Sequence, residues 1–313
     1  MKTTHENLLK KLNAGVCALA FTGVLLASTV TASAANDDKA SAQTTQQVEK
    51  NTQAKTAEKR KEIVSEAVSA LNDTRDALKA LDDKDSQKAL SVLQGVTGKL
   101  EIILARDPSL TLVPAGVNAV TYSIVGPLDD IKKMRDQAKN LLDDGKIQEA
   151  RHLMQDLASE TDINTTNIPL ATYPAAIKKA AKLIDEGKTE EAKAVLQTAL
   201  NTVVVTQTIV PLPIVAAQAM LKEADKLAEN KQRKADENKR LSALLDGAQA
   251  SIKFAQTLGY GQKKDFDSFY EEIDKIRNKT ADGKSGSGFF ETIKGYMTSM
   301  TKNSQPEKPA NKT

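Results

Sequence analysis

The sequence is poor in the residues that build covalent cross-links and most metal sites. Its 313 residues include one cysteine, Cys17, no tryptophan, and two histidines, His5 and His152. One thiol forms no internal disulfide, and these few residues do not make a structural zinc site. The 44 basic residues nearly balance the 41 acidic ones, and the two signs are interleaved along the chain. We therefore expect no disulfide scaffold, no metal or other cofactor, and no nucleic-acid partner.

The first 34 residues are typical of a secretory signal peptide. Basic residues precede an apolar run, Leu12–Val30, which is followed by Ala32-Ser33-Ala34. The alternative, a retained membrane anchor, is less favoured because the run contains glycine, serine and threonine and ends in an A-x-A triplet. We predict cleavage after Ala34, which leaves a secreted mature chain that has no cysteine and no stable membrane insertion.

Three segments have compositions typical of chains without a fixed fold. Residues 35–61 are almost wholly polar or alanine, with Val48 as the only larger aliphatic residue. Such a segment buries too little apolar area to offset its conformational entropy, so we predict a disordered linker or a fraying helix start. Residues 281–288 are rich in glycine and serine, which predicts a flexible linker. Residues 302–313 are predicted to be a disordered tail.

The fold class predicted for residues 62–280 is mainly α, built from antiparallel helical hairpins. Apolar residues recur every three or four positions from Ile63 to Leu81, and again from Ala89 to Leu104 after the polar turn Asp82–Asp85. The same spacing predicts two more hairpins. Their helices are expected at 128–142 with 147–158, and at 174–186 with 189–200.

One stretch of the sequence occurs twice. LLDDGKIQEARHLM (Leu141–Met154) returns 42 residues later as LIDEGKTEEAKAVL (Leu183–Leu196). In both copies a glycine, Gly145 or Gly187, follows an acidic pair, where it supplies the left-handed residue that ends a helix. The turn resembles that of a tetratricopeptide repeat, but that repeat has a period of about 34 residues and aromatic positions that are missing here. We predict a duplicated hairpin within one helical domain.

The connections between hairpins carry the most strand-like sequence. Thr202–Val210 is dense in β-branched residues, and Ser109–Val113 is a shorter match. These segments are expected either to pair as a small β-ribbon or to pack as apolar linkers across helix ends. Proline-bearing connections at 112–116, 167–173 and 209–214 are candidates for an apolar binding patch on one side of the molecule. The alternative is that they only cover the core. The residues singled out there are Pro169, Tyr173 and Pro211.

The C-terminal third combines charge with most of the aromatic residues. One long helix is predicted from Ile214 to Leu258, with a charged middle that is either solvated or a coiled-coil contact. Residues 289–301 predict a short amphipathic helix that docks on its own chain, on a neighbour or on a membrane, the last being least favoured because no polybasic face supports it. Its candidate binding residues are Phe289, Phe290, Ile293, Tyr296 and Met297.

Several of these segments together resemble the YfdX family of enterobacterial proteins. They are the two repeated hairpins, the connection IPLATYPAAI and the segment GYGQKKDF, and the resemblance spans roughly residues 62–276. It implies a periplasmic, mostly helical, stress-induced protein that is associated with acid, drug or heat tolerance and is often oligomeric. The family has no agreed biochemical activity, so the resemblance supplies no catalytic residues.

The residues themselves give little sign of catalysis. The carboxylate pairs Asp82-Asp83, Asp129-Asp130 and Asp143-Asp144 lie at predicted helix boundaries, where water hydrates them. His152 takes the place of Ala194 in the other copy, which predicts a surface position, with pH sensing as the alternative. The sequence has no phosphate-binding glycine loop, serine hydrolase elbow, H-E-x-x-H or calcium loop. We predict that the protein is not an enzyme.

Two non-catalytic functions remain. The first is a stress chaperone that binds unfolding client proteins through apolar surface and forms a homo-oligomer. The alternative is a helical module that binds small hydrophobic molecules or drugs near Tyr122, Tyr173 and the aromatic C-terminal third. A minor alternative is an oligomeric scaffold for one specific protein partner.

Overall fold

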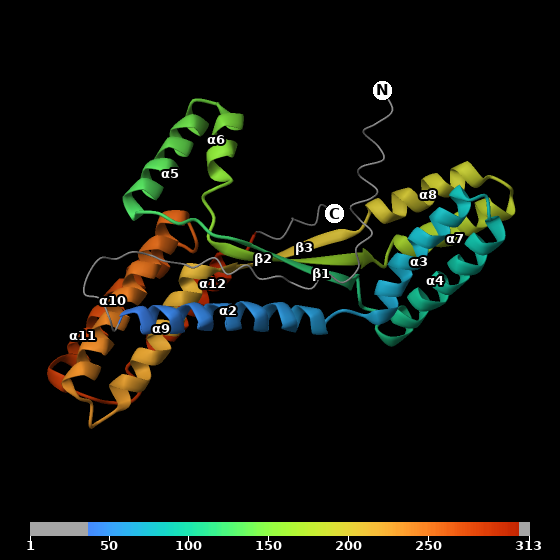
Figure 1. Cartoon of the computed structure of the whole chain (residues 1–313). Coiled ribbons are helices and arrows are strands. Elements are labelled where there is room, and N and C mark those ends of the chain that lie inside the picture. The colour runs from blue at the N-terminus through green and yellow to red at the C-terminus, as the bar shows by residue number, and fades with distance from the viewer. Residues whose placement is uncertain (1–36, 307–313) are drawn as a thin grey trace. The chain divides into compact units, whose positions relative to one another are not determined.

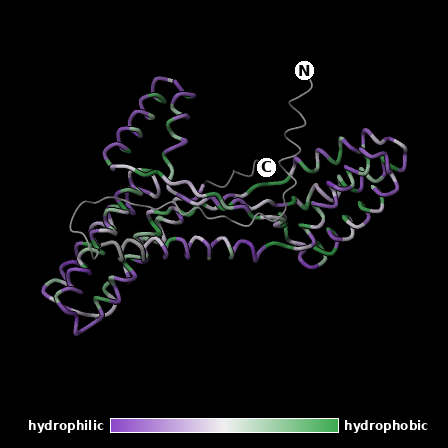
Figure 2. The backbone as a smooth tube through the Cα atoms, in the orientation of Figure 1, coloured by the Kyte–Doolittle hydropathy of each residue, from purple (hydrophilic) through white to green (hydrophobic). Residues whose placement is uncertain are grey.

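The chain folds mainly into helices, as the periodicity predicts. The structure is a computed structural model that describes residues 37–306, with side chains from residue 44 onward. The predicted signal peptide lies outside the described residues. Figure 1 shows the arrangement of the elements. The α-helices are α2 (Asp37–Lys61), α3 (Ser65–Asp82), α4 (Ser86–Arg106), α5 (Leu128–Asp143), α6 (Ile147–Met154), α7 (Tyr173–Asp185), α8 (Thr189–Asn201), α9 (Leu212–Glu229), α10 (Ala235–Leu258), α11 (Lys263–Thr280) and α12 (Glu291–Asn303). In Figure 2 the hydropathy alternates along the helices, as expected for amphipathic helices.

Three strands form an antiparallel sheet between the helical hairpins. They are β1 (Leu112–Tyr122), β2 (Glu160–Pro169) and β3 (Val204–Pro211), in the spatial order β1-β2-β3. Most of the segment Thr202–Val210 lies in β3, whereas only Leu112 and Val113 of Ser109–Val113 lie in β1, and the two strands do not pair with each other. Each pairs with β2, which the sequence analysis missed because its residues, ETDINTTNIP, are mostly polar. β2 is nonetheless largely buried, since it lies in the middle of the sheet.

Two of the predicted hairpins pack together as a four-helix bundle. Helices α3 and α4 form the first hairpin, and α7 and α8 form the hairpin of the second repeat copy. Their apolar faces share one core, in which Leu93, Leu100, Ile177 and Leu196 are each 0 % exposed. Ion pairs at the rim of the bundle join the two hairpins. One of these connects Lys193 of α8 to Asp82 of α3 at 3.0 Å.

The hairpin of the first repeat copy, α5 and α6, lies outside that bundle. Its two helices pack on each other, and α5 contacts α10. Of its side chains only Ile131, Ala138 and Ala150 are buried. Sequence periodicity predicted the hairpin correctly, but it gave no sign that this copy lies outside the bundle.

The predicted long helix from Ile214 to Leu258 is wrong. The chain turns back after Glu229, and α10 packs along α9. The charged residues expected in mid-helix make this turn. The Arg233 guanidinium donates hydrogen bonds to the carbonyl oxygens of Leu227 (2.7 Å) and Lys284 (2.8 Å). A second core unites α9 to α12, with Phe269 and Phe290 each 0 % exposed.

The segments predicted to lack structure are ordered where the structure describes them. Residues 37–61 form α2, whose Val48 is 5 % exposed and packs against Ile163 of β2 and Val210 of β3. Thr52 and Thr56 of α2 are also buried, and the helix contacts α9, β1 and β2. The 281–288 segment begins with a short 3-10 turn and is held by a hydrogen bond from the Gly286 amide to the Ala228 carbonyl (3.0 Å).

The amphipathic helix near the C-terminus docks on its own chain. Asp265 of α11 accepts hydrogen bonds from Ser299 (2.9 Å) and Asn303 (2.6 Å) of α12. Gln305, in the predicted tail, bonds to Ile209 of β3. Residues 307–313 lie outside the described part. No helix in the described part is long and apolar enough to cross a membrane.

Candidate functional site

The residues predicted to form a binding surface are mostly core residues. Tyr173 lies in the bundle core, and Phe290, Ile293 and Met297 lie in the second core, all at most 2 % exposed. Pro211 is buried, whereas Pro169, Phe289 and Tyr296 are partly exposed. These eight side chains therefore do not make one exposed apolar surface.

The predicted gathering of the proline connections is also wrong. Pro169 pairs with Leu112 at one end of the sheet, whereas Pro211 pairs with Glu160 at the opposite end of β2. The three connections are the strands and their ends, and antiparallel pairing places Pro114 and Pro169 at one end of the sheet and Pro211 at the other. They support the alternative interpretation, in which these segments cover the core.

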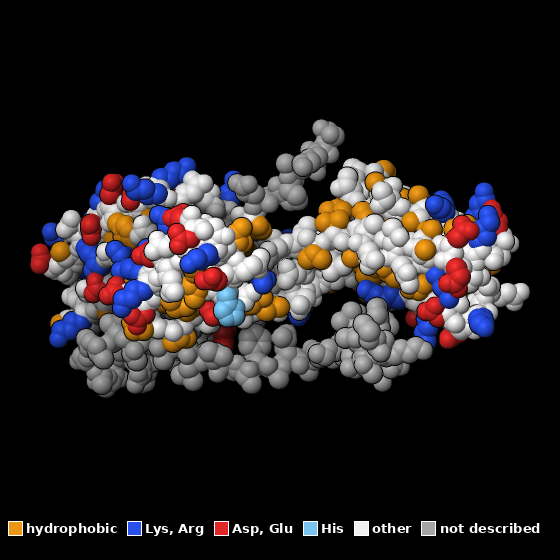
Figure 3. Space-filling model, turned by 90° about the horizontal axis from the view of Figure 1, so that it is seen from above, with side chains coloured by type: hydrophobic (Ala, Val, Ile, Leu, Met, Phe, Trp, Pro, Cys, Tyr) orange, Lys and Arg blue, Asp and Glu red, His pale blue; other side chains and the backbone are white. Residues whose placement is uncertain are grey.

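Six of the nine exposed large apolar side chains of the described residues lie on the first repeat copy, on β1 and in the loop between them, whereas Ile102 lies on α4 and Val204 and Val205 lie on β3. Leu142, Ile147 and Met154 are 44 %, 61 % and 50 % exposed, and we call them the α5–α6 apolar face. Ile147 and Met154 are seven residues apart, so they lie on the same side of α6. Tyr122 and Val125, at the end of β1 and in the loop before α5, are also exposed. Figure 3 shows hydrophobic side chains reaching this surface among charged ones.

The second repeat copy shows what normally covers such a face. The positions of Leu142 and Met154 correspond to Ile184 and Leu196, which are 5 % and 0 % exposed. There, α3 and α4 bury both side chains. The first copy keeps apolar residues at the same places, although it does not pack on α3 and α4 and its main contact with the rest of the fold is between α5 and α10. This difference in exposure becomes visible only when the packing partner of each copy is known. The sequence analysis therefore did not identify these residues.

One buried and one half-buried carboxyl group lie where β2 begins. Glu160 and Asp162 are two residues apart on one face of the strand, and Asp162 is 8 % exposed with its Oδ1 atom unpartnered. Burial raises the pKa of both carboxyl groups, and the nearby Asp162 charge adds to the rise at Glu160. Burial also raises the pKa of Tyr260, whose hydroxyl accepts a hydrogen bond from the Ser159 amide at 2.9 Å.

Perturbed carboxyl groups are common in catalytic sites, but this pair lacks the other parts of one. The groove between α9 and α12, described next, is not lined by it. Within residues 37–306, no three histidine, cysteine, aspartate or glutamate side chains converge as metal ligands. His152 is exposed, as predicted, and so are the aspartates of the three carboxylate pairs. We therefore interpret the carboxyl pair as part of the folded structure at the start of β2.

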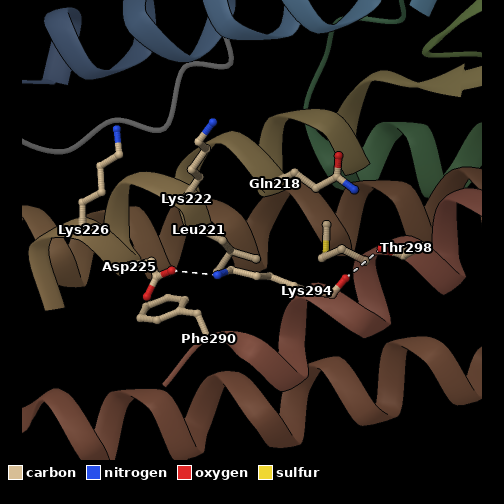
Figure 4. Close-up of a pocket in the computed structure, with 9 residues that line it drawn as sticks. Gln218, Leu221, Lys222, Asp225, Lys226, Phe290, Lys294 and Thr298 are labelled. Atoms are coloured by element: carbon tan, nitrogen blue, oxygen red, sulfur yellow. Dashed lines mark hydrogen bonds and ion pairs between the residues drawn. The ribbon is translucent and has the colours of Figure 1, made fainter. Parts of the chain in front are cut away.

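A groove runs between α9 and α12 and has a volume of about 450 Å³. Figure 4 shows Lys294 of α12 crossing it to Asp225 of α9, at 2.9 Å between Nζ and Oδ2. Leu221, Phe290 and Met297 line its apolar part. Lys222 and Lys226 are on its rim, exposed and without an ion-pair partner among the described residues. An apolar floor with free ammonium groups suits an anionic amphipathic molecule.

Comparison with known proteins identifies a family. Residues 70–209 match the family model described as YfdX protein. A solved structure of YfdX from Salmonella Typhi is similar at 17 % identity, covering 48 % of this chain and 93 % of that chain with a TM-score of 0.34. No curated protein matches the sequence. The resemblance that the sequence analysis placed over residues 62–276 is confirmed for 70–209, a region that begins in α3 and ends in β3. This match to the YfdX family model covers 140 of the 313 residues.

Proposed function

We propose that this chain is a non-catalytic, periplasmic stress-response protein that binds unfolding client proteins through the α5–α6 apolar face. One observation carries the proposal: Leu142 and Met154 are about half exposed, whereas their counterparts in the second copy are buried under a helical hairpin. Exposed apolar side chains on a soluble surface are costly unless a partner covers them, and such patches mark interaction sites.

The surroundings of this face suit a partner of variable sequence. The hairpin carries acidic and basic side chains close together, such as the ion pairs of Asp129 with Lys132 and Asp130 with Lys133, both at 2.9 Å. Mixed charges impose no single sign on the partner. Methionine at position 154 adds a flexible apolar contact that adapts to differently shaped surfaces.

The test is suppression of aggregation of a labile enzyme, followed by light scattering, at pH 7 and at about pH 4. We expect the wild-type protein to suppress scattering near stoichiometric amounts, and the double variant Leu142→Glu, Met154→Glu to lose most of that effect. Both substituted side chains are exposed, so folding should be little affected.

The matched control adds the same charges elsewhere on the same helices. The double variant Gln137→Glu, Gln148→Glu alters two exposed positions outside the apolar face and should suppress aggregation as well as the wild type. Equal loss in both variants would assign the effect to net charge. No suppression by the wild-type protein at either pH would contradict the chaperone-like function itself.

A second candidate function, binding of a small amphipathic molecule, is favoured by the α9–α12 groove. Its volume lies within the range of small-molecule sites, about 300–1,000 Å³. Laurate provides a simple probe, because its carboxylate suits Lys222 and Lys226 and its alkyl chain suits the apolar floor. We expect the double variant Lys222→Ala, Lys226→Ala to weaken laurate binding in calorimetry. The exposed pair Lys231→Ala, Lys239→Ala should not, and equal weakening would mean nonspecific charge attraction.

A further inference from the structure

The outer edge of β3 exposes backbone hydrogen-bonding groups in a regular pattern. β3 pairs with β2 on one side only, and its other side faces no strand among the described residues. Along an antiparallel strand, the N–H and C=O groups of successive residues alternate between the two sides. The Asn167 side chain donates to the Val204 carbonyl at 3.1 Å, so residue 204 faces β2. Residues 205, 207 and 209 therefore direct their N–H and C=O groups away from the sheet.

One of these three positions is already occupied by an amide. The Ile209 N–H donates to Gln305 Oε1 at 3.0 Å, and Gln305 Nε2 donates to the Ile209 carbonyl at 2.8 Å. A carboxamide carries the same donor and acceptor as a peptide group. Gln305 thus pairs with β3 as one residue of a fourth strand would.

The next two positions along the edge have no such partner. No described group bonds to the outward N–H or C=O of Val205 or Gln207, and both side chains are exposed. The segment Thr202–Ile209 contains no charged residue and no proline. Natural edge strands are usually protected by charged residues, by proline or by a β-bulge, because an unpaired edge can pair with another strand.

The opposite edge of the same sheet is protected. β1 contains Pro114, and its pairing with β2 shifts register between Pro114 and Gly116. The Pro114 carbonyl accepts a hydrogen bond from the Val64 amide at 3.0 Å, and α2 and α3 both contact this strand. The opposite edge is thus interrupted and covered at the start of β1, whereas β3 has no such protection at Val205 and Gln207.

We infer that the β3 edge from Val205 to Gln207 binds an extended segment of another polypeptide as an added antiparallel or parallel strand. This inference rests on the proposed function, because it specifies the form in which a client segment is held. An unfolding client exposes extended backbone of any sequence, and pairing through main-chain groups requires no particular side chains. The amide that Gln305 places on Ile209 indicates that the ligand chemistry is a peptide group.

The chain's own C-terminal tail is a poor occupant of the same edge. It continues from Gln305 as PEKPANKT, in which Pro306 and Pro309 have no N–H to donate. The alternative occupant of this edge is β3 of a second copy of the chain. Its presence would be seen as a dimer that the edge variants below convert to a monomer.

The experiment measures binding of a fluorescein-labelled peptide with the sequence of residues 202–208, TVVVTQT, by fluorescence anisotropy to the full chain. The double variant Val205→Pro, Gln207→Pro removes two outward N–H groups and no β2–β3 hydrogen bond, and proline is tolerated on edge strands. We expect it to weaken binding about tenfold or more. The control Val205→Ala, Gln207→Ala keeps both N–H groups and should bind within about twofold of the wild type.

A second measurement locates the peptide on the strand. Amide hydrogen exchange should slow at Val205 and Gln207 when the peptide is added, while residues 204 and 206, which already face β2, should change little. Far-UV circular dichroism and urea unfolding of each variant establish that the fold is kept. A peptide carrying N-methyl groups on alternate amides should bind the wild-type protein more weakly than the unmodified peptide.

Three outcomes would overturn the inference. They are unchanged peptide binding by the proline variant, no slowing of exchange at Val205 and Gln207, and a wild-type dimer that the proline variant dissociates without any peptide binding. The variant Leu142→Glu, Met154→Glu separates this inference from the proposed function, because it should bind the peptide normally. A variant that loses aggregation suppression but binds the peptide normally reports on the α5–α6 apolar face. A variant that loses peptide binding but still suppresses aggregation reports on the β3 edge.

Discussion

Helices α5 and α6 and helices α7 and α8 are built from the same repeated sequence but meet different surroundings. Their turns are alike in detail: the Gly145 and Gly187 amides each bond at 3.0 Å to the carbonyl three residues earlier, with φ values of 73° and 75°. One hairpin packs on α3 and α4, while the other leaves Leu142 and Met154 exposed. Local sequence thus determines a hairpin, and its packing partner decides whether its apolar face is core or binding surface.

The largest expected effect contrasts one residue in each copy. Leu196→Ala removes a fully buried side chain from the bundle and should lower the free energy of unfolding by about 2–5 kcal/mol. Met154→Ala, at the corresponding position of the first copy, should change it by no more than about 0.5 kcal/mol, because Met154 is half exposed. Urea unfolding of both variants measures the difference. Similar losses would mean that the α5–α6 face is covered in solution.

Amide hydrogen exchange tests the same difference between the two hairpins without any substitution. Elements with few buried contacts open locally at a lower free energy than the core. The amides of α6 should therefore exchange faster than those of α8 in the free protein. Binding of a client at the α5–α6 apolar face should slow exchange in α6 and leave α8 unchanged, whereas slowing in both would place the client elsewhere.

Lowering the pH should change the free energy of unfolding in opposite directions through a carboxyl group at the start of β2 and through one in the bundle. Burial raises the pKa of Asp162, so the folded chain holds a proton that the unfolded chain releases above about pH 4. Its contribution to stability is therefore fully present below the unfolded pKa and is lost as the pH rises through the folded pKa. Asp162→Asn carries no titrating group, so it should be more stable than the wild type at pH 7, and this advantage should vanish near pH 4.

Glu66 in α3 supplies the opposite case within the bundle. Hydrogen bonds from its own backbone amide and from Arg106 lower the pKa of Glu66 to about 2. The stabilisation that the Glu66 carboxylate provides is present above the pKa of Glu66 in the unfolded chain. It is lost as the pH falls through the pKa of Glu66 in the folded chain. Glu66→Gln should therefore be less stable than the wild type at pH 7 and equal to it near pH 2. Urea unfolding checks the signs, from pH 4 to pH 7 for the Asp162 variant and from pH 2 to pH 7 for the Glu66 variant, and slopes of the same sign would contradict this account.

Periodicity predicted the hairpins because a helix with an apolar stripe folds in much the same way wherever it packs. The features that periodicity did not predict depend on tertiary contacts. Val48 docks α2 because β2 and β3 offer it a core, and Arg233 turns the chain where composition alone favours one long helix. Most of the predicted surface residues lie in cores because apolar residues such as Phe290 and Leu142 look alike in sequence, although Phe290 is buried and Leu142 is exposed.

The turn of the first hairpin, α3–α4, provides the smallest expected effect. In the turn between α3 and α4, Lys84 occupies the position of Gly145 and Gly187, with a φ of 62°. Its hydrogen bonds match those of the glycine turns, since the Lys84 amide bonds to the Leu81 carbonyl at 3.1 Å and the Asp85 amide to the Ala80 carbonyl at 2.8 Å. The left-handed conformation strains a residue that has a Cβ atom.

Replacing Lys84 by glycine should therefore relieve this strain and raise the free energy of unfolding by about 0.5–1 kcal/mol. The converse variant, Gly187→Ala, should lower it by about the same amount or more, because alanine resists a positive φ. Thermal and urea unfolding measure both. A loss of stability in Lys84→Gly would show that the lysine side chain contributes more to this turn than its backbone conformation costs. The three hairpins would then differ in their turns as well as in their partners.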